Sequence, residues 1–271
     1  MSKTMVVCDK LTKRFDLSDP WLVRKLTGVP KRELVAVDAV SFEIPRGQTY
    51  ALVGESGSGK STIARMVVGL MQPDAGGVTI DGHNLNTSQD SASLREVRQT
   101  LQMVFQSPYS SLNPRWRVND ILLEPIRAFD LISDEDGQNR RARELLDQVG
   151  LSASDAAKYP HEFSGGQRQR ISIARGLASN PSFMVCDEPT SALDVSVQAQ
   201  VLNLLKELQR ELGLTYLFIS HDMAVVRVMA HHIGVLKDGR LVEKNTAEKL
   251  FRNPQETYTK TLIDATPKVM V

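Results

Sequence analysis

Residues 49–62 read TYALVGESGSGKST and join a strand pattern to a loop and then to a helix pattern. The apolar run 49–53 predicts a short buried strand that ends at a glycine. Residues 54–61, which we call the phosphate loop, fit the pattern G-x-x-x-x-G-K-[ST], a phosphate-binding pattern when it lies between a strand and a helix. The helix is predicted over 61–71 by apolar residues at helical spacing, namely Ile63, Met66, Val67 and Leu70.

The phosphate loop contains the residue types that phosphate binding needs. Its glycines permit positive φ angles and close backbone approach, so successive N–H groups and the helix N-terminus can surround phosphates. Lys60 is expected to reach the β- and γ-phosphates of a nucleotide, and the Ser61 hydroxyl is expected to bind Mg²⁺. The candidate nucleotide-binding residues are Gly54, Glu55, Ser56, Gly57, Ser58, Gly59, Lys60, Ser61 and Thr62.

A second apolar run, SFMVCDEP at 182–189, predicts a strand that ends in two carboxylates. Asp187 can hold Mg²⁺ through a water molecule, and Glu188 can polarise a water that attacks a phosphate. Two adjacent acids at a strand end can also be a solvated pair, but beside a phosphate loop the catalytic interpretation is favoured.

Strand and helix patterns alternate along most of the chain. Further strands are predicted at 34–44, 78–80, 101–106 and 214–220, and a long amphipathic helix at 196–212. This alternation, with right-handed crossovers, predicts an α/β fold with a largely parallel sheet covered by helices. Ligands bind such sheets at the carboxyl ends of the strands, so chemistry is expected in the loops after Val53, Gln106, Cys186 and Ser220.

Two segments interrupt the alternation. Residues 107–163 are rich in prolines and amphipathic helix patterns, including a surface helix predicted at 140–149, and we interpret them as an inserted helical subdomain. Residues 16–34 are polar, contain proline and Trp21, and are predicted to be a loop insertion.

The run Ser164-Gly-Gly-Gln167 precedes a helix predicted over 167–177. The amides at the N-terminus of that helix could receive a phosphate. On its own the run fits an N-cap followed by a flexible turn equally well, so its interpretation depends on the other motifs.

Composition excludes several classes of protein. Because 41% of the 271 residues are hydrophobic, the chain can form a packed core, which excludes disordered and collagen-like proteins. With 33 lysines and arginines against 32 acidic residues, the net charge of +1 gives no sign of a nucleic-acid partner. Cys8 and Cys186 lie in apolar runs, which favours free thiols and a cytoplasmic location. No signal peptide or membrane span is expected.

Taken in order, the motifs within residues 54–222 resemble those of the ATP-binding cassette ATPases, the nucleotide-binding subunits of ABC transporters. The Ser-Gly-Gly-Gln run is that superfamily's signature. The resemblance implies a P-loop NTPase fold with a RecA-like parallel core, an antiparallel β subdomain and an inserted helical subdomain. It assigns 1–106 and 164–245 to the core with its β subdomain, 107–163 to the insertion, and 246–271 to a short C-terminal extension typical of peptide importers.

The resemblance also implies residue roles. Gln106 looks like the glutamine that senses the γ-phosphate and Mg²⁺, and His221 looks like the switch histidine that contacts the γ-phosphate. The expected catalytic set is Lys60, Gln106, Glu188 and His221, and the expected magnesium set is Ser61, Gln106 and Asp187. In this family two subunits close face to face, so Ser164, Gly165, Gly166 and Gln167 are expected to complete the partner's ATP site. The D-loop is expected at Ser191, Ala192, Leu193 and Asp194.

Two aromatic assignments stay open between alternatives. The side chain that stacks on adenine is expected to be Phe15, at the end of the first strand, rather than Trp21 in the insertion, with a core position as the alternative for Phe15. The surface 108–124, with Tyr109 and Trp116, resembles the region that contacts a permease, although both aromatics fit the subdomain core equally.

Three longer stretches, 104–118, 187–205 and 253–267, look like the ATPase subunits of oligopeptide, dipeptide and nickel importers, and specifically the second of their two unlike ATPases. The expected function is to bind and hydrolyse ATP, with Mg²⁺, and so to energise import of peptides or similar small solutes. The expected location is the cytoplasmic face of the bacterial inner membrane. The expected partners are a second ATPase in a heterodimer or homodimer, two transmembrane permeases and a periplasmic solute-binding protein. The alternative is a non-transport ATPase in a soluble assembly of the carbon–phosphorus lyase type.

Overall fold

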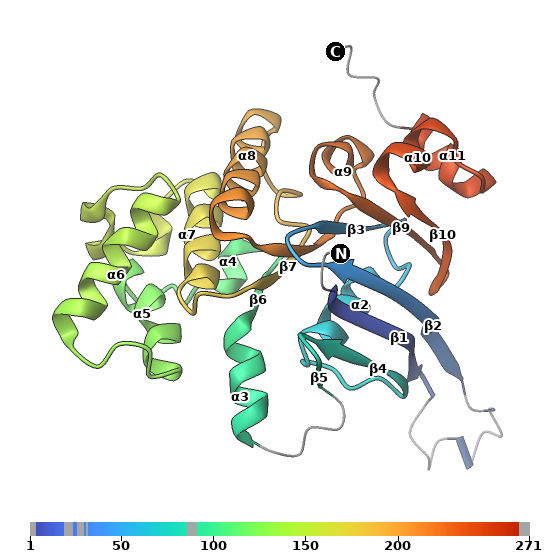
Figure 1. The fold of residues 1–271 in the computed structure, drawn as a ribbon, viewed down its shortest axis with the longest axis horizontal. Helices are drawn as coiled ribbons and strands as arrows, with labels where there is room; N and C mark the ends of the chain where they lie inside the picture. The colour runs from blue at the N-terminus through green and yellow to red at the C-terminus, as the bar shows by residue number, and fades with distance from the viewer. Residues whose placement is uncertain (1–3, 19–23, 26–29, 31, 86–90, 266–271) are drawn as a thin grey trace.

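A six-stranded sheet forms the centre of the computed structural model, which describes residues 4–18, 24–25, 30, 32–85 and 91–265 (Figure 1). The strand order is β10-β9-β3-β8-β7-β6. β3 pairs in parallel with β8 and β9, β7 pairs in parallel with β6 and β8, and only β10 runs antiparallel, against β9. The strands are β3 (Thr49–Val53), β6 (Leu101–Val104), β7 (Phe183–Asp187), β8 (Thr215–Ile219), β9 (His232–Lys237) and β10 (Arg240–Thr246). The predicted parallel α/β sheet is confirmed.

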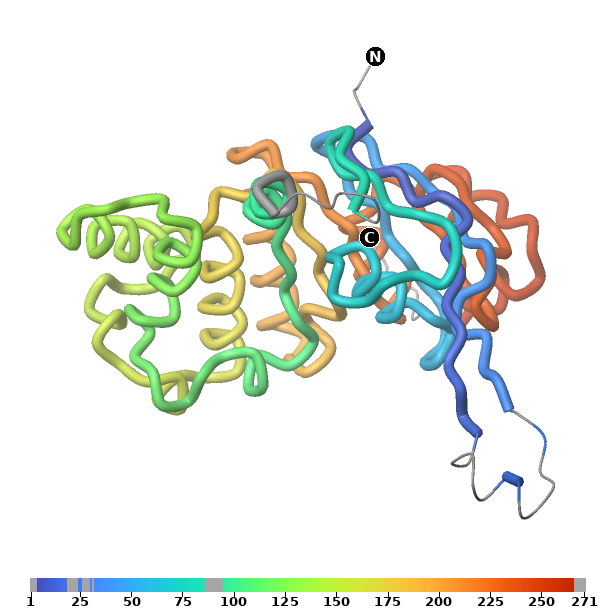
Figure 2. The backbone as a smooth tube through the Cα atoms, turned by 90° about the horizontal axis from the view of Figure 1, so that it is seen from below, coloured from blue at the N-terminus to red at the C-terminus, as the bar shows by residue number. Residues whose placement is uncertain are grey.

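A second, antiparallel sheet of four strands has the order β2-β1-β4-β5. Its strands are β1 (Thr4–Asp16), β2 (Glu33–Pro45), β4 (Ala75–Ile80) and β5 (His83–Asn84). The prediction of a loop beginning at residue 16 and ending at 34 was too wide, because Phe15 pairs with Leu34 and Asp16 with Glu33 in the ladder. β1 and β2 therefore form a long hairpin that reaches beyond the rest of the molecule (Figure 2). Trp21 lies outside the described residues.

Helix α2 (Lys60–Val67) follows the phosphate loop and packs Ile63, Met66 and Val67 into the core between the two sheets. The predicted end at residue 71 was wrong. The chain leaves the helix after Val67 and turns at Gly69, whose φ is +72°. Gly76 and Gly77 belong to strand β4. Helix α3 (Ser91–Thr100) was not predicted at all.

The segment between β6 and β7 is helical, as its sequence pattern indicates. It contains α4 (Pro108–Ser111), α5 (Val118–Ala128), α6 (Glu135–Gln148), the 3₁₀ turns η1 (Ala153–Ala157) and η2 (Pro160–Glu162), and α7 (Gly165–Leu177). α8 (Val195–Leu212) follows β7. Along β7 the side chains alternate, so Met184 and Cys186 join the core under these helices while Phe183 and Val185 face the core under α2. Cys8 and Cys186 are buried free thiols, as predicted, and burial raises the pKa of Cys186 to about 12.

The last three helices help to form a third core, which lies on the same face of the sheet as the core under α7 and α8 but at the β3–β9 end. They are α9 (Met223–Met229), α10 (Ala247–Arg252) and α11 (Thr257–Asp264). Buried residues of α9 and α10 pack with Ala51 and Val53 of β3 and with Ile233 and Val235 of β9. Figure 1 shows α10 and α11 beside β9 and β10, at the end of the molecule opposite α5 and α6. The strand that leads into the phosphate loop is thus supported by the C-terminal helices.

Candidate active site

The phosphate loop connects the carboxyl end of β3 to the N-terminus of α2, and two of its glycines cannot be replaced without strain. A Cβ atom on Gly54 would lie 2.1 Å from the Leu236 carbonyl oxygen, and one on Gly59 would lie 2.4 Å from the Ala36 carbonyl oxygen. Their φ angles are +150° and +103°. Only glycine combines these dihedrals with so close a backbone approach, which explains the residue type at both positions.

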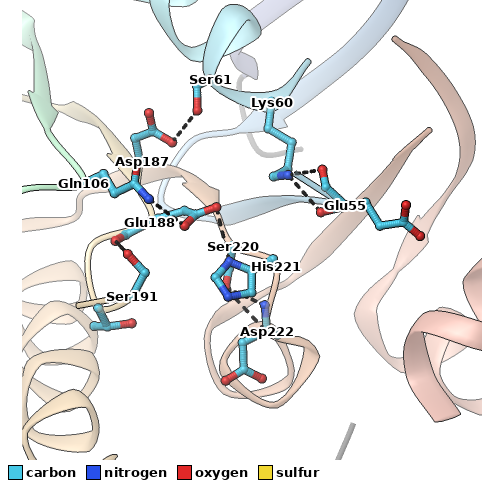
Figure 3. A network of polar contacts seen from close by, with 12 residues as sticks. Glu55, Lys60, Ser61, Gln106, Asp187, Glu188, Ser191, Ser220, His221 and Asp222 are labelled. Carbon is cyan, nitrogen blue, oxygen red and sulfur yellow. Dashed lines mark hydrogen bonds and ion pairs between the residues drawn. The ribbon is translucent and has the colours of Figure 1, made fainter. Parts of the chain in front are cut away.

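Lys60 begins α2 and is only 5% exposed. Its ammonium group donates hydrogen bonds to the carbonyl oxygens of Gly54 at 2.8 Å and Glu55 at 2.7 Å (Figure 3). Burial lowers the pKa of Lys60, and the nearby carboxylates of Glu188, Asp187 and Glu55 oppose that shift. The side chain is therefore folded back onto the phosphate loop.

Asp187, the last residue of β7, lies opposite the phosphate loop. The Ser61 hydroxyl donates a hydrogen bond to its carboxylate at 3.2 Å. The residue is 6% exposed, and burial raises the pKa of its carboxyl. Ser61 and Asp187 thus bring oxygen ligands together, which is the donor type that Mg²⁺ prefers.

Glu188 is the centre of a polar network that three loops assemble (Figure 3). Gln106 Nε2 donates to Glu188 Oε2 at 3.0 Å, and His221 Nδ1 lies 3.2 Å from Glu188 Oε1. The backbone of Glu188 has a φ of +46°, and its N–H donates to the Ile219 carbonyl at 3.0 Å. A left-handed conformation is unfavourable for glutamate, so the neighbouring strands impose the direction of this side chain.

These loops surround one cavity of about 700 Å³. It is lined by the phosphate loop, Thr62, Gln106, Glu188 and His221, as the sequence leads one to expect. Phe15 also lines it and is half-buried outside every core cluster, which argues against the core alternative for this side chain. Sequence reasoning missed three more lining residues, Leu34, Ala36 and Leu262.

The signature residues do not line this cavity. Ser164 is exposed and forms a capping box with Gln167, in which Gln167 N–H donates to Ser164 Oγ at 3.3 Å and Ser164 N–H donates to Gln167 Oε1 at 3.0 Å. Gly166 packs so tightly on α8 that a Cβ atom there would lie 2.3 Å from Val197 Cγ1. The N-cap interpretation of this run is therefore confirmed as local geometry, and it leaves the helix N-terminus directed to the surface.

The predicted D-loop lies beside Glu188. Ser191 Oγ donates to the Glu188 carbonyl at 3.1 Å, Leu193 packs against the core under α8, and Asp194 is the N-cap of α8. Ala192 is exposed. A small cavity of about 150 Å³ is shared by Ser191, Leu193, Glu188 and His221.

Tyr109 and Trp116 are surface residues, with 63% and 43% of their area exposed, and they belong to no core cluster. Tyr109 instead contacts α7, because Arg168 of that helix donates to the Tyr109 hydroxyl at 2.6 Å.

Among the described residues, no helix is both long and apolar enough to cross a bilayer.

Comparison with known proteins agrees with this geometry. The family model described as "ABC transporter" matches residues 37–191. The oligopeptide transport ATP-binding protein OppF of Bacillus subtilis is 50% identical over 238 residues, which are 88% of this chain and 78% of that protein. A putative peptide import ATP-binding protein of Brucella abortus is 46% identical over 266 residues, which are 98% of this chain and 78% of that protein.

Solved structures give the same assignment. The ATP-binding cassette MJ0796, in a dimeric post-hydrolysis state bound to ADP and Pi, superposes with a TM-score of 0.77 and 30% identity over 90% of this chain and 99% of that chain. CbiO1 of Clostridium perfringens, part of an ABC transporter complex, gives a TM-score of 0.75 and 25% identity, covering 92% of this chain and 91% of that chain. A nucleotide-sized cavity at the phosphate loop and relatives of this similarity lead to one conclusion: the chain belongs to the ATP-binding proteins of the ABC transporter family.

Proposed function

We propose that this chain binds and hydrolyses ATP to energise the import of peptides. The observation that carries the proposal is the assembly of the phosphate loop, Gln106, Glu188 and His221 around one cavity in a chain half-identical to an oligopeptide transport ATP-binding protein. The presence of a positioned acid at the cavity favours a hydrolytic subunit over one that only binds nucleotide.

Lys60 and the phosphate loop are proposed to bind the phosphates. The loop offers backbone N–H groups at a helix N-terminus, which suits an anion. The Lys60 ammonium has three donors. Two of them bond the Gly54 and Glu55 carbonyls, and the third makes only a 3.5 Å contact with Ser58 Oγ, so it can turn to a phosphate oxygen. Phe15, on the cavity wall, is proposed to stack on adenine.

Ser61 and Asp187 are proposed to hold Mg²⁺, with Gln106 completing the set. These residues suit Mg²⁺ because the Ser61 hydroxyl lies 3.2 Å from the buried Asp187 carboxylate, and Mg²⁺ prefers oxygen ligands. When bound, the ion supplies positive charge that neutralises the phosphate oxygens. Asp187 gains a cationic partner that offsets the cost of burying its carboxylate.

Glu188 is proposed to orient the attacking water as general base. Its side chain is 15% exposed, and Gln106 and His221 each contact one carboxylate oxygen. His221 is 59% exposed and comes from the loop after β8, so it can turn toward a γ-phosphate when one enters the cavity. The two contacts keep the carboxylate directed to the cavity until substrate binds.

A second ATPase subunit is proposed to complete the site. Ser164 is exposed at the N-terminus of α7, and neither Ser164 nor Gly166 lines this chain's own cavity, so the nucleotide that they are proposed to contact is one held by another subunit. Face-to-face pairing of two such chains, identical or different, would place the Ser164 surface of each chain against the nucleotide cavity of the other. The remaining partners are proposed to be two permeases and a solute-binding protein, with this chain at the cytoplasmic face of the inner membrane.

The exposed side of the helical segment is proposed to contact the permeases. A groove of about 350 Å³ lies between α5 and α7 on one side and β6 and the turn 68–70 after α2 on the other. Phe105, 39% exposed, lines it one residue before Gln106. A permease segment bound there would contact Phe105, the neighbour of Gln106, and Gln106 in turn contacts Glu188.

Copurification from the native cell tests the proposal. A tagged Glu188→Gln variant, held with Mg²⁺ and ATP, is expected to retain two multispan membrane proteins and a second ATPase, identified by mass spectrometry. The same preparation without ATP is the control. Cells that lack this chain are expected to lose uptake of labelled peptides and to regain it with the wild type but not with Glu188→Gln. Recovery of soluble enzymes without any membrane protein would instead establish a non-transport assembly.

A further inference from the structure

The C-terminal helix α11 contacts the phosphate loop directly. The backbone N–H of Glu55 donates a hydrogen bond to the Tyr258 hydroxyl at 3.0 Å, across 203 residues of sequence. The same peptide unit carries the Gly54 carbonyl, which accepts from the Lys60 ammonium at 2.8 Å. One peptide group is therefore held on one side by Tyr258 and on the other by Lys60.

Tyr258 is itself held firmly in place. Glu243 of β10, 9% exposed, accepts backbone hydrogen bonds from Gln255 at 3.0 Å and Glu256 at 3.1 Å, which fixes the turn before α11. The Lys237 ammonium lies 4.9 Å from the centroid of the Tyr258 ring, within the range of a cation–π contact. The hydroxyl is thus directed at Glu55 by contacts with two neighbouring strands.

Packing places the rest of α11 at the same site. Tyr258, Leu262 and Ile263 pack against the cluster that contains Ala51 and Val53 of β3, the strand that leads into the phosphate loop. Leu262 lies one helical turn after Tyr258, on the same face, and lines the 700 Å³ cavity. The helix therefore contributes both a hydrogen bond to the loop and part of the cavity wall.

We propose that Tyr258 is a positioning residue for nucleotide binding, which keeps the first peptide of the phosphate loop and, through it, Lys60 in the conformation that accepts ATP. The proposal rests on ATP binding by this site. A glycine-rich loop samples other conformations when a contact is lost, and the apparent Kd rises as the competent fraction falls. Because a neutral hydrogen bond is involved, the expected effect is about three- to tenfold in Kd.

Isothermal titration of the full chain with MgATP tests this, together with hydrogen–deuterium exchange of peptides that cover residues 54–60. Tyr258→Phe keeps the ring and its contact with Lys237 and removes only the hydroxyl. We expect Kd to rise about three- to tenfold and the phosphate loop to exchange faster without nucleotide. In steady-state assays KM is expected to rise while kcat stays near the wild-type value, since Glu188 and its partners are untouched.

Thr261→Ala is the matched control, because the exposed Thr261 hydroxyl on the same helix donates only to the Thr257 carbonyl. It is expected to change neither Kd nor loop exchange. A second variant, Leu262→Ala, removes part of the cavity wall and leaves the Tyr258 hydroxyl in place, so weaker MgATP binding with unchanged exchange in residues 54–60 is expected. Equal Kd and equal loop exchange in Tyr258→Phe and the wild type would overturn the inference. A wild-type chain that binds no MgATP would instead refute the proposed function.

Discussion

Glu188 combines three features that seldom occur together in one residue: a left-handed backbone, a mostly buried carboxylate and polar contacts from two other loops. A left-handed glutamate costs on the order of 1 kcal/mol or more. Such strain persists where the surrounding structure imposes it, and here it directs the carboxylate into the cavity.

Replacement of the Glu188 side chain is expected to separate ATP binding from ATP hydrolysis. Glu188→Gln keeps the size and loses the basic carboxylate, so ATP turnover is expected to fall by about 10²- to 10⁴-fold while MgATP affinity stays within about twofold. Phosphate release by the assembled complex measures the first quantity and titration calorimetry the second. Glu211→Gln, an exposed change near the end of α8, is the control. Unchanged turnover would refute the catalytic assignment of Glu188.

Ser61 permits a test of the proposed Mg²⁺ ligands. Ser61→Ala removes the hydroxyl that lies 3.2 Å from the Asp187 carboxylate. One lost ligand is expected to raise the Mg²⁺ concentration for half-maximal ATPase activity by about tenfold or more. Magnesium titration of turnover is the measurement, and Ser133→Ala, an exposed serine in the helical segment, is the control. If both variants require the same Mg²⁺ concentration, Ser61 is not a ligand.

At the scale of the elements, the packing of α7 on α8 constrains the signature run. A Cβ atom on Gly166 would lie 2.3 Å from Val197 Cγ1, whereas one on Gly165 meets its nearest neighbour, Leu193 Cδ2, at 3.6 Å. Valine is stiff about χ1, so it cannot move aside freely. Of these two adjacent glycines, only Gly166 is needed for α7 and α8 to approach each other this closely.

Urea denaturation of two variants checks this difference. Gly166→Ala is expected to lower the free energy of unfolding by about 1–3 kcal/mol through overpacking, and Gly165→Ala to change it by less than about 1 kcal/mol. The double variant Gly166→Ala with Val197→Ala removes the obstructing methyl groups and is expected to recover most of the loss. Equal destabilisation by both single variants would show that α7–α8 packing is not the cause.

The elements that the sequence predicted well are those with a strong apolar pattern. The buried strands β3, β7 and β8 were predicted to within a residue or two because each is an unbroken apolar run between polar loops. Helix α3 was missed because SASLREVRQT has few apolar residues, and its neighbours looked like one polar connection. Helix α2 ends early because Gly69 turns the chain, although the apolar spacing continues to Leu70.

The sequence likewise predicted only part of the candidate site. The motifs predicted that Gln106, Glu188 and His221 follow strands whose carboxyl ends meet, since sheet topology alone brings them to one edge. Sequence could not show that Gln106 and His221 both contact the Glu188 carboxylate. Tyr258 was not predicted, because the partner of its hydroxyl is a backbone N–H, which leaves no mark in the residue types.

At the scale of the whole molecule, the two groups of residues proposed to contact ATP lie on different parts of the surface. The phosphate loop lies at the centre of the sheet, whereas Ser164 lies at the end of α7, among the helices on one side of it (Figure 1). On the proposed function, a single copy is expected to bind a nucleotide through the phosphate loop and to leave Ser164 exposed. Hydrolysis is then expected to depend on pairing, while binding is not.

A change at Ser164 tests that dependence. Ser164→Asn keeps a good N-cap for α7, so the helix stays folded, but it replaces the small hydroxyl at the exposed surface. We expect the MgATP affinity of the isolated chain to be unchanged and the turnover of the assembled complex to fall by about tenfold or more, because the altered surface contacts only the partner's nucleotide. Lys60→Ala is the contrasting variant, expected to weaken binding by the isolated chain as well as turnover. If Ser164→Asn weakened MgATP binding by the isolated chain, the signature would act on this chain's own site, and a paired arrangement would not be needed to explain it.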